Sequence, residues 1–394
     1  MRRSPLLPIF LIVLVDVLGM TIVIPLLAIY AEKFGASPLT ATLIMSSFAA
    51  CQLVSGPFLG ALSDRYGRRP VLLISQLGTL LGFVILARAD ALWMVFAGRI
   101  LDGATAGNLA IAQAYIADHT PPEKRAQSFA LIGIAFGLGF AFGPVISGVL
   151  AHHSLAAPFW LAAALSGCAI AGTLFILPRE DGRARDTSAP LRILDLKTYV
   201  TYFARPRMGQ LLAAFFIYML TFSLFIGGFA LFSERHYTWH GLPFTPREIG
   251  FVFAGSAVVG LVIQGGLIRR LVPRYGEVKL ATVGFATLVI GYALLGVDSA
   301  LAFLAFATLF SSIGNSLLRP TLTALITREA TPREQGVVLG LTQSLSSIAA
   351  IVAPPLAGWL IKHDRGPIWA YLAAGVGAAG LLAMLRKLAP PPAV

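Results

Sequence analysis

The feature that most constrains this chain is a succession of twelve long apolar runs. A helix needs about 20 residues to cross the hydrocarbon core of a bilayer, and each run has roughly that length. The runs lie near residues 8–30, 39–62, 70–88, 92–117, 126–149, 156–177, 208–232, 246–270, 278–296, 300–327, 334–360 and 367–387. They predict an all-α membrane protein with twelve transmembrane helices.

The low charge content argues against a water-soluble fold. Only 12% of the residues are charged, which is about half the proportion of an average soluble domain. The net charge of +12 could suggest nucleic acid, but the basic residues fall in short clusters between apolar runs and form no continuous stripe. Cys51 and Cys168 lie inside apolar runs, so we expect no disulfide and no metal site. No nucleic acid partner and no cofactor are expected either.

The basic residues of the loops predict the orientation in the membrane. One side of the predicted bundle carries most of them: Arg2, Arg3, Arg65, Arg68, Arg69, Lys124, Arg125, Arg269, Arg270, Arg274, Arg386 and Lys387. By the positive-inside rule both termini are cytoplasmic. The first run follows two arginines, as a signal peptide would, but it is too long, carries Asp16 and lacks a small-residue cleavage site.

A long polar stretch divides the chain into two halves of six runs each. We expect a six-helix bundle over residues 1–178, a cytoplasmic linker over 179–207 and a second six-helix bundle over 208–394. The halves share weak internal similarity at an offset of about 211 residues, as parallel repeats do. Gly103 corresponds to Gly314, and the turn Tyr66-Gly67 corresponds less exactly to Tyr275-Gly276. Similarity between apolar helices also arises by chance, so the repeat alone does not decide the fold.

The loop after the second run contains the most specific motif. It reads Gly60-Ala61-Leu62-Ser63-Asp64-Arg65-Tyr66-Gly67-Arg68-Arg69. This resembles the G-x-L-x-D-R-x-G-R-[KR] signature of the major facilitator superfamily. A basic turn that only anchors a hairpin would explain the arginines, but it would not explain the acid and the two glycines in register. The resemblance implies two six-helix bundles that rock about a central site.

In this family the motif forms a latch between the halves. We expect Gly60 to allow close approach of a helix and Gly67 to permit a tight turn. Asp64 should face the positive N-terminus of the eleventh helix, near residues 334–336. Arg65 or Arg68 should lie near Asp118, at the end of the fourth helix.

The fifth run resembles the antiporter signature of the twelve-helix drug:proton antiporter family, which includes the tetracycline efflux pumps. The residues that carry this resemblance are Gly133, Gly137, Gly139, Gly143, Pro144 and Gly148. Glycines at this spacing also simply allow close helix packing, and both roles can hold together. Tetracycline is a doubtful substrate, because the ninth run carries no acid where the tetracycline pumps have one, and Ala28 stands where a second proline is common after Pro25.

A few charges inside the apolar runs are the candidates for coupling. Charged side chains in a bilayer are costly, so each is expected to be functional or paired. Arg99 and Asp102 are three residues apart and can form an ion pair, either for structure or for proton coupling. Asp16 has no such neighbour in sequence, and we expect it to carry a proton, although a packing role would also explain it. Arg319 precedes Pro320 and could line a cavity or bind an anion.

Polar residues within the runs are candidates for substrate binding, although several could instead bridge helices. They are Gln52, Asn108, Gln113, Asn315, Arg319 and Gln343. No glycine is followed by lysine, and neither His-Glu-x-x-His nor Gly-x-Ser-x-Gly occurs. ATPase or hydrolase machinery is therefore not expected, and neither is enzyme activity.

These observations predict a proton-coupled secondary transporter that exports hydrophobic small molecules from a bacterium across its inner membrane. The partners expected are a small-molecule substrate, protons and lipid, and the protein is expected to be a monomer. One alternative is a proton symporter that imports a small, possibly anionic, metabolite. A non-transporting receptor on the same fold is a further alternative, against which the buried charges argue.

Overall fold

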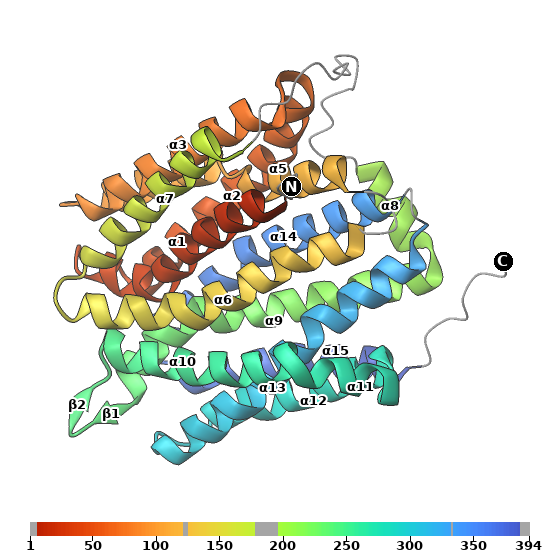
Figure 1. Cartoon of the computed structure of the whole chain (residues 1–394). Coiled ribbons are helices and arrows are strands. Elements are labelled where there is room, and N and C mark those ends of the chain that lie inside the picture. Colours follow the sequence, from red (N-terminus) through yellow and green to blue (C-terminus); the bar gives the residue numbers. More distant parts are fainter. Residues whose placement is uncertain (1–5, 121–124, 178–195, 332–333, 387–394) are drawn as a thin grey trace. The chain divides into compact units, whose positions relative to one another are not determined.

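The computed structural model describes residues 6–120, 125–177, 196–331 and 334–386, and it is almost entirely helical (Figure 1). The chain forms two compact units. Unit 1 consists of Met1–Ala36 and Ser47–Leu194, and unit 2 consists of Ser37–Ser46 and Asp195–Val394. Most of the predicted linker, residues 179–195, lies outside the described residues. The all-helical membrane fold predicted from the sequence is confirmed.

Unit 1 contains the first six apolar runs. Its helices are α1 (Leu6–Glu32), most of α2 (Pro38–Tyr66), α3 (Arg68–Ala87), α4 (Leu92–Ala104), α5 (Asn108–His119), α6 (Arg125–Ala151) and α7 (Ala157–Phe175). Helix α1 packs against α5, α6 and α7, while α3 packs against α4 and α7. A core of buried aliphatic side chains, including Ile9 and Ile111, surrounds Tyr115.

Unit 2 contains the remaining runs and the first turns of α2. Its own elements are α8 (Leu196–Ala204), α9 (Pro206–His236), α10 (Pro246–Val262), the π-helix η2 (Ile263–Leu267), α11 (Ile268–Tyr275), α12 (Glu277–Leu295), α13 (Leu301–Glu329), α14 (Gln335–Lys362) and α15 (Gly366–Leu385). Strands β1 (Thr238–Trp239) and β2 (Leu242–Pro243) form a short hairpin between α9 and α10. The closest packing joins α12 to α13 and α15, and α9 to α14 and α15.

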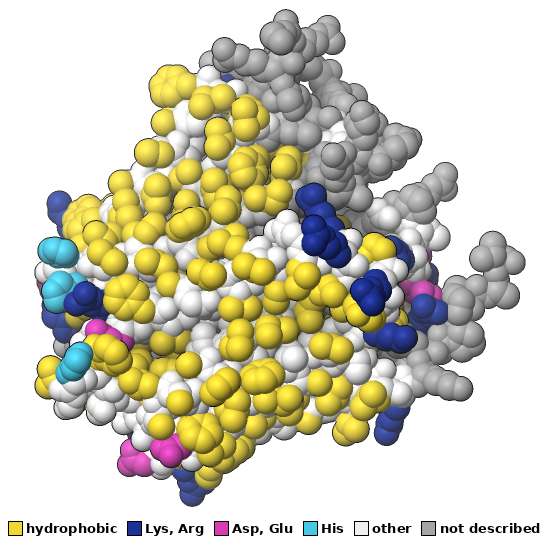
Figure 2. Space-filling model, turned by 60° about the horizontal axis from the view of Figure 1, so that its bottom comes forward, with side chains coloured by type: hydrophobic (Ala, Val, Ile, Leu, Met, Phe, Trp, Pro, Cys, Tyr) yellow, Lys and Arg dark blue, Asp and Glu magenta, His cyan; other side chains and the backbone are white. Residues whose placement is uncertain are grey.

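Eleven helices in the described part of the chain are long and apolar enough to span a membrane. The predicted run 92–117 accounts for the difference from twelve, because it is not one continuous helix as expected. It forms α4 and α5, separated by Thr105, Ala106 and Gly107. Hydrophobic side chains cover most of the face in Figure 2, with charged ones mainly towards its left and right sides. The protein is therefore a multi-pass integral membrane protein.

The two halves share one turn that the internal similarity predicted. Gly67 has a φ of 98° and Gly276 a φ of 77°, a left-handed region that favours glycine because a Cβ would be strained there. Each glycine directly follows a tyrosine at a helix end and precedes a new helix, α3 or α12.

Two ion pairs connect the start of unit 2 to the segment between α13 and α14. Arg205, which precedes α9, pairs with Glu334 at 2.7 Å, and Arg207 pairs with Glu329 at 3.0 Å. The guanidinium group of Arg205 also lies over the ring of Tyr202 on α8, 4.5 Å from its centroid. The end of α8 is thereby tied to the beginning of α14.

Candidate functional site

A carboxyl group from α1 and an amide from α5 form the first pair of the candidate site. Asp16 lies in the first half of α1, three turns into the helix of 27 residues, and is partly buried. The side-chain nitrogen of Asn108 donates a hydrogen bond of 2.7 Å to Asp16 Oδ1. Asn108 is the first residue of α5, so the carboxylate lies next to the positive end of a half-helix.

The predicted ion pair on α4 is formed and buried. Arg99 Nη1 lies 2.6 Å from Asp102 Oδ2, and both residues are only 5% exposed. The hydroxyl of Thr79, on α3, also bonds to Asp102. The guanidinium of Arg99 lies over the ring of Phe48, 4.0 Å from its centroid, an arrangement in which the ring face attracts the cation.

The two pairs belong to one polar cluster in unit 1. Asp16 and Asp102 lie close enough for their carboxylates to interact electrostatically. Arg99 Nε is buried and has no hydrogen-bond partner among the described residues, and the same holds for Asn108 Oδ1. A buried polar atom without a partner is costly. The cluster therefore retains the capacity to bond water or another polar group.

The break between α4 and α5 lies within this cluster and is held by two serines. The Ser75 hydroxyl, on α3, bonds to the carbonyl oxygen of Thr105 and accepts a bond of 2.9 Å from the Gly107 amide. Ser55, on α2, donates to the Gly103 carbonyl at 2.6 Å. These contacts satisfy backbone groups that the interrupted helix leaves open. The break thus lies between Asp102 and Asn108, and the two serines fix its position.

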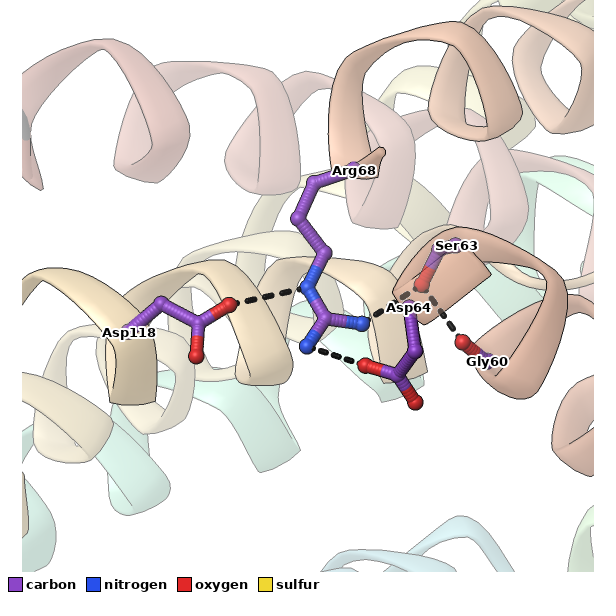
Figure 3. A network of polar contacts seen from close by, with 5 residues as sticks. All are labelled: Gly60, Ser63, Asp64, Arg68 and Asp118. Atoms are coloured by element: carbon purple, nitrogen blue, oxygen red, sulfur yellow. Dashed lines mark hydrogen bonds and ion pairs between the residues drawn. The ribbon is translucent and has the colours of Figure 1, made fainter. Parts of the chain in front are cut away.

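The loop between α2 and α3, which carries the motif that resembles the superfamily signature, forms a network around Arg68 (Figure 3). Arg68 contacts Asp64 at 2.5 Å and Asp118 at 3.0 Å, and it donates to the Ser63 hydroxyl at 2.7 Å. Ser63 in turn donates to the Gly60 carbonyl at 2.6 Å. The expected proximity of Arg68 to Asp118 is therefore present. Arg65 instead lies over the ring of its neighbour Tyr66.

The expected close approach at Gly60 is not found within the described residues, where nothing lies within 4 Å of the position that a Cβ would take. Its carbonyl, rather than its lack of a side chain, contributes to the network. The position of Asp64 relative to residues 334–336 stays a prediction.

Helix α6 contains the glycines of the predicted antiporter signature. A Cβ at Gly143 would overlap Thr21 of α1, and one at Gly139 would overlap Val17. The Thr21 hydroxyl donates to the Gly139 carbonyl at 2.9 Å. A Cβ at Gly133 would meet nothing within 4 Å. The glycines near Pro144 therefore bring α6 against α1 two turns or less from Asp16.

The other two glycines of the signature lie on the same helix. Gly137 is partly buried and Gly148 is buried, both within α6.

Comparisons with known proteins identify the family. The family described as the Major Facilitator Superfamily matches residues 9–274 and 239–394. The chain belongs to this superfamily. The class B tetracycline resistance protein of Escherichia coli is 31% identical over 91% of this chain and 88% of that protein. Multidrug resistance protein 2 of Bacillus subtilis is 28% identical over 93% of this chain and 92% of that protein.

Solved structures agree on the fold of this major facilitator. The human organic anion transporter MFSD10 has a TM-score of 0.75 and 23% identity, covering 97% of this chain and 99% of that one. The nucleoside transporter NupG has a TM-score of 0.75 and 13% identity, covering 98% and 100%. These structures show the fold. The family match identifies the chain as a transporter of the superfamily, and its similarity to the tetracycline and multidrug resistance proteins agrees with the resemblance seen in the sequence.

Helix α12 begins one residue before the predicted ninth run, at Glu277. This carboxylate pairs with Arg328 at 2.7 Å. It therefore lies at the helix end and not within the span.

Unit 2 of the transporter contains a second polar cluster that includes Arg319. Arg319 is exposed near the middle of α13 and interacts electrostatically with the Tyr218 hydroxyl on α9. One turn earlier, Asn315 donates to the Tyr292 hydroxyl at 3.4 Å. Phe225 stacks on the Tyr292 ring with centroids 4.9 Å apart. This cluster combines one cation with aromatic faces.

The remaining predicted substrate residues are spread over several helices. Gln52 on α2 and Gln113 on α5 are partly buried, whereas Gln343 on α14 is exposed. Among the described residues, Gln52 and Gln113 form no hydrogen bond with the Asp16 cluster of their own unit, and Gln343 forms none with the Arg319 cluster of its own unit.

Sequence reasoning missed Ser75, Thr79 and Phe48. Ser75 and Thr79 stand one turn apart on an otherwise apolar helix, together with Gln76, whose buried amide has no partner among the described residues. A polar stripe of this kind in a transmembrane helix is a signal that could have indicated them.

Proposed function

We propose that the chain is a proton-coupled antiporter that exports hydrophobic small molecules by alternating access, from the cytoplasm across a bacterial inner membrane. The observation that carries the proposal is the Asp16–Asn108 pair beside the Arg99–Asp102 pair, at the break of a transmembrane segment. Two titratable carboxyls are thereby held inside unit 1. The naming of several relatives as tetracycline or multidrug resistance proteins supports export as the direction.

The proposed coupling rests on access of water to Asp16. A carboxyl group that passes between water and a low-dielectric interior changes its affinity for protons. If Asp16 faces water on different sides in two conformations, proton binding favours one of them and proton release favours the other. Asn108 stabilises the ionised form by donating a hydrogen bond to it. Arg99 is neutralised by Asp102 and positions that second carboxyl.

A second candidate function is proton symport of a small organic anion. Arg319 favours it, because an exposed cation in the middle of a transmembrane helix would attract an anionic substrate. The Tyr218 ring, which interacts with that arginine, and the stacked rings of Phe225 and Tyr292 in the same unit suit an aromatic or hydrophobic anion as well as a neutral drug. The charge of the transported molecule distinguishes the two functions.

The test measures dye transport in cells that lack their own major efflux pumps. We expect the parent protein to lower accumulation of ethidium, a hydrophobic cation, and we expect a protonophore to abolish the effect. Asp16→Asn, which mimics the neutral acid, should fold normally and lose uphill export, whereas downhill exchange in proteoliposomes should persist.

Asp90→Asn is the matched control, because Asp90 is an exposed acid in the loop before α4. Its transport should equal that of the parent. If Asp16→Asn pumps as well as the parent, Asp16 serves packing only. Asp102 then becomes the leading candidate for the residue that carries the proton. Proton-dependent uptake of fluorescein, an anionic dye, without ethidium export would favour the symporter.

A further inference from the structure

Unit 2 carries an open apolar groove between α13 and the bulged helix made of α10, η2 and α11. The groove has a volume of about 360 Å³, and every side chain that lines it is Val, Ile or Leu. It extends from Val258 on α10, past Ile263 in the π-helix, to Leu271 on α11. Leu309 and Ile313 of α13 form the opposite wall. Figure 1 shows α13 lying beside these elements.

The π-helix accounts for the shape of this region. Residues Ile263–Leu267 form a wider turn, and such a turn shifts the following helix relative to the preceding one. Gly265 and Gly266 lie within it, where an added Cβ would meet nothing within 4 Å. Val258 is 60% exposed and Val262 is 63% exposed. The groove is therefore loosely packed as well as apolar, as expected of a surface that contacts lipid chains and not water.

One end of the groove carries basic side chains. Leu267 is the last residue of η2 and Leu271 lies on α11; Arg270 and Arg274 follow them three residues later and therefore lie on the same helix face. Arg269 is two residues from each leucine and lies on another face. All three arginines are exposed. This end is the one that the charge pattern places at the cytoplasmic surface.

We propose that the groove, together with Arg270 and Arg274, binds an anionic phospholipid. One acyl chain would lie against the aliphatic walls, and the headgroup phosphate would contact the two guanidinium groups. Arginines bind phosphate well because their planar donors match its oxygens, and basic pockets on the cytoplasmic side of membrane proteins suit anionic headgroups. A zwitterionic lipid should bind less tightly, because its ammonium group repels the two guanidinium groups and offsets the attraction of its phosphate. The proposal goes beyond transport and does not depend on proton coupling.

The experiment compares lipids that remain bound to the full-length protein in native mass spectrometry. The protein is equilibrated in mixed micelles with equal amounts of phosphatidylglycerol and phosphatidylethanolamine of identical chains. We expect the parent to retain phosphatidylglycerol preferentially. Arg270→Gln and Arg274→Gln should each reduce that preference about fivefold, as expected for one basic side chain at a membrane surface. The double variant should abolish the preference.

Arg269→Gln is the matched control, since it removes the same charge from a different face and should leave the preference unchanged. Val262→Trp places a large side chain in the groove from an exposed position and should reduce retention of both lipids. Its yield can be checked separately by size-exclusion chromatography.

Three outcomes would overturn the proposal. One is equal retention of the two lipids by the parent. Another is a loss in Arg269→Gln as large as in the other variants, which would mean that total surface charge decides. The third is a dimer in the parent that Val262→Trp converts to a monomer without change in bound lipid, because a second copy would then occupy the groove.

Discussion

The fourth transmembrane segment differs between the two halves of the molecule. In unit 1 it is interrupted between α4 and α5, and Arg99 on it is buried and paired with Asp102. In unit 2 the corresponding segment, α13, is continuous over 29 residues, and its Arg319 is exposed. At an offset of about 211 residues, Arg319 even corresponds to Asn108, the partner of Asp16. Equivalent positions thus carry different chemistry.

The difference extends to the acids of each unit. Among the described residues of unit 2, every acid lies at an end of a membrane span or in a loop, whereas unit 1 holds Asp16 within α1 and Asp102 beside the break inside its fourth segment. Under the proposed function, unit 1 handles protons and unit 2 supplies an aromatic, cationic surface for substrate. Four predictions, two for each unit, sharpen this comparison, from the largest expected effect to the smallest.

The largest effect concerns the buried ion pair of unit 1. Asp102→Asn leaves the Arg99 guanidinium buried without its carboxylate, and breaking a buried pair in this way costs about 3–5 kcal/mol. We expect the amount of folded protein in membranes to fall sharply, as measured by fluorescence-detected size-exclusion chromatography. The double variant Arg99→Leu with Asp102→Leu should recover much of the yield. Normal yield of Asp102→Asn with lost transport would instead assign the pair to the transport cycle.

The next effect concerns the exposed arginine of unit 2. If Arg319 binds an anionic group, Arg319→Gln should raise the KM for an anionic dye about 10- to 100-fold, since a hydrogen bond to a charged group is worth about 1.5–3 kcal/mol. Arg319→Lys should retain part of the affinity. Ethidium transport should be unchanged or improved. Equal loss for both dyes would indicate a structural role for Arg319.

A smaller effect is expected from a change in the packing of α6 against α1. Gly143→Ala introduces a Cβ that would overlap Thr21, and overpacking of this kind costs about 1–3 kcal/mol. Gly133→Ala is the control, because the same added Cβ meets open space. In thermal unfolding of the purified protein we expect a lower Tm for the first variant only. Equal Tm values would show that α1 and α6 separate without penalty.

The smallest effect concerns Glu334 at the beginning of α14. Its hydrogen bond from Arg205, together with those from Thr331, lowers the pKa of this carboxyl from 4.5 to about 2. A lowered pKa means that the ionised pair stabilises the fold above about pH 4.5 and loses this contribution as the pH falls towards 2. Glu334→Gln should therefore lower the free energy of unfolding at pH 7 by about 0.2–1 kcal/mol, as for an exposed pair, and lower Tm slightly. The difference from the parent should shrink at acidic pH, and a difference that is constant with pH would contradict the assignment.

Hydropathy was sufficient to locate the spans, because the need for about 20 apolar residues applies to each segment separately. Thus the run predicted at 278–296 is α12, Glu277–Leu295. The break at Thr105 could not be predicted, because a hydropathy window averages over a single interrupted turn and glycine is common in continuous transmembrane helices. The π-helix that begins at Ile263 could not be predicted either, because its residues are apolar and a hydropathy window does not distinguish it from an α-helix.

Residue spacing predicted contacts within a helix but not between helices. Arg99 and Asp102 are three apart, so their pairing followed from helical geometry. Asp16 and Asn108 come from different helices of unit 1, and their hydrogen bond depends on how α1 packs against α5. The contact of Arg68 with Asp118 was expected only because the loop resembles a known family signature. Contacts between different helices depend on tertiary packing, which residue spacing does not predict.

The interrupted fourth segment also has a consequence for how the protein is made. Helices α4 and α5 contain 13 and 12 residues, so each is about 20 Å long or less at about 1.5 Å per residue, while the hydrocarbon core is about 30 Å thick. Neither half can cross alone during cotranslational insertion, and an open backbone turn facing lipid would be costly. Residues 92–119 must therefore enter the bilayer as one segment. Ser55 and Ser75 precede them in the chain, so both serines are synthesised before the opened turn to which their hydroxyls bond in the folded protein.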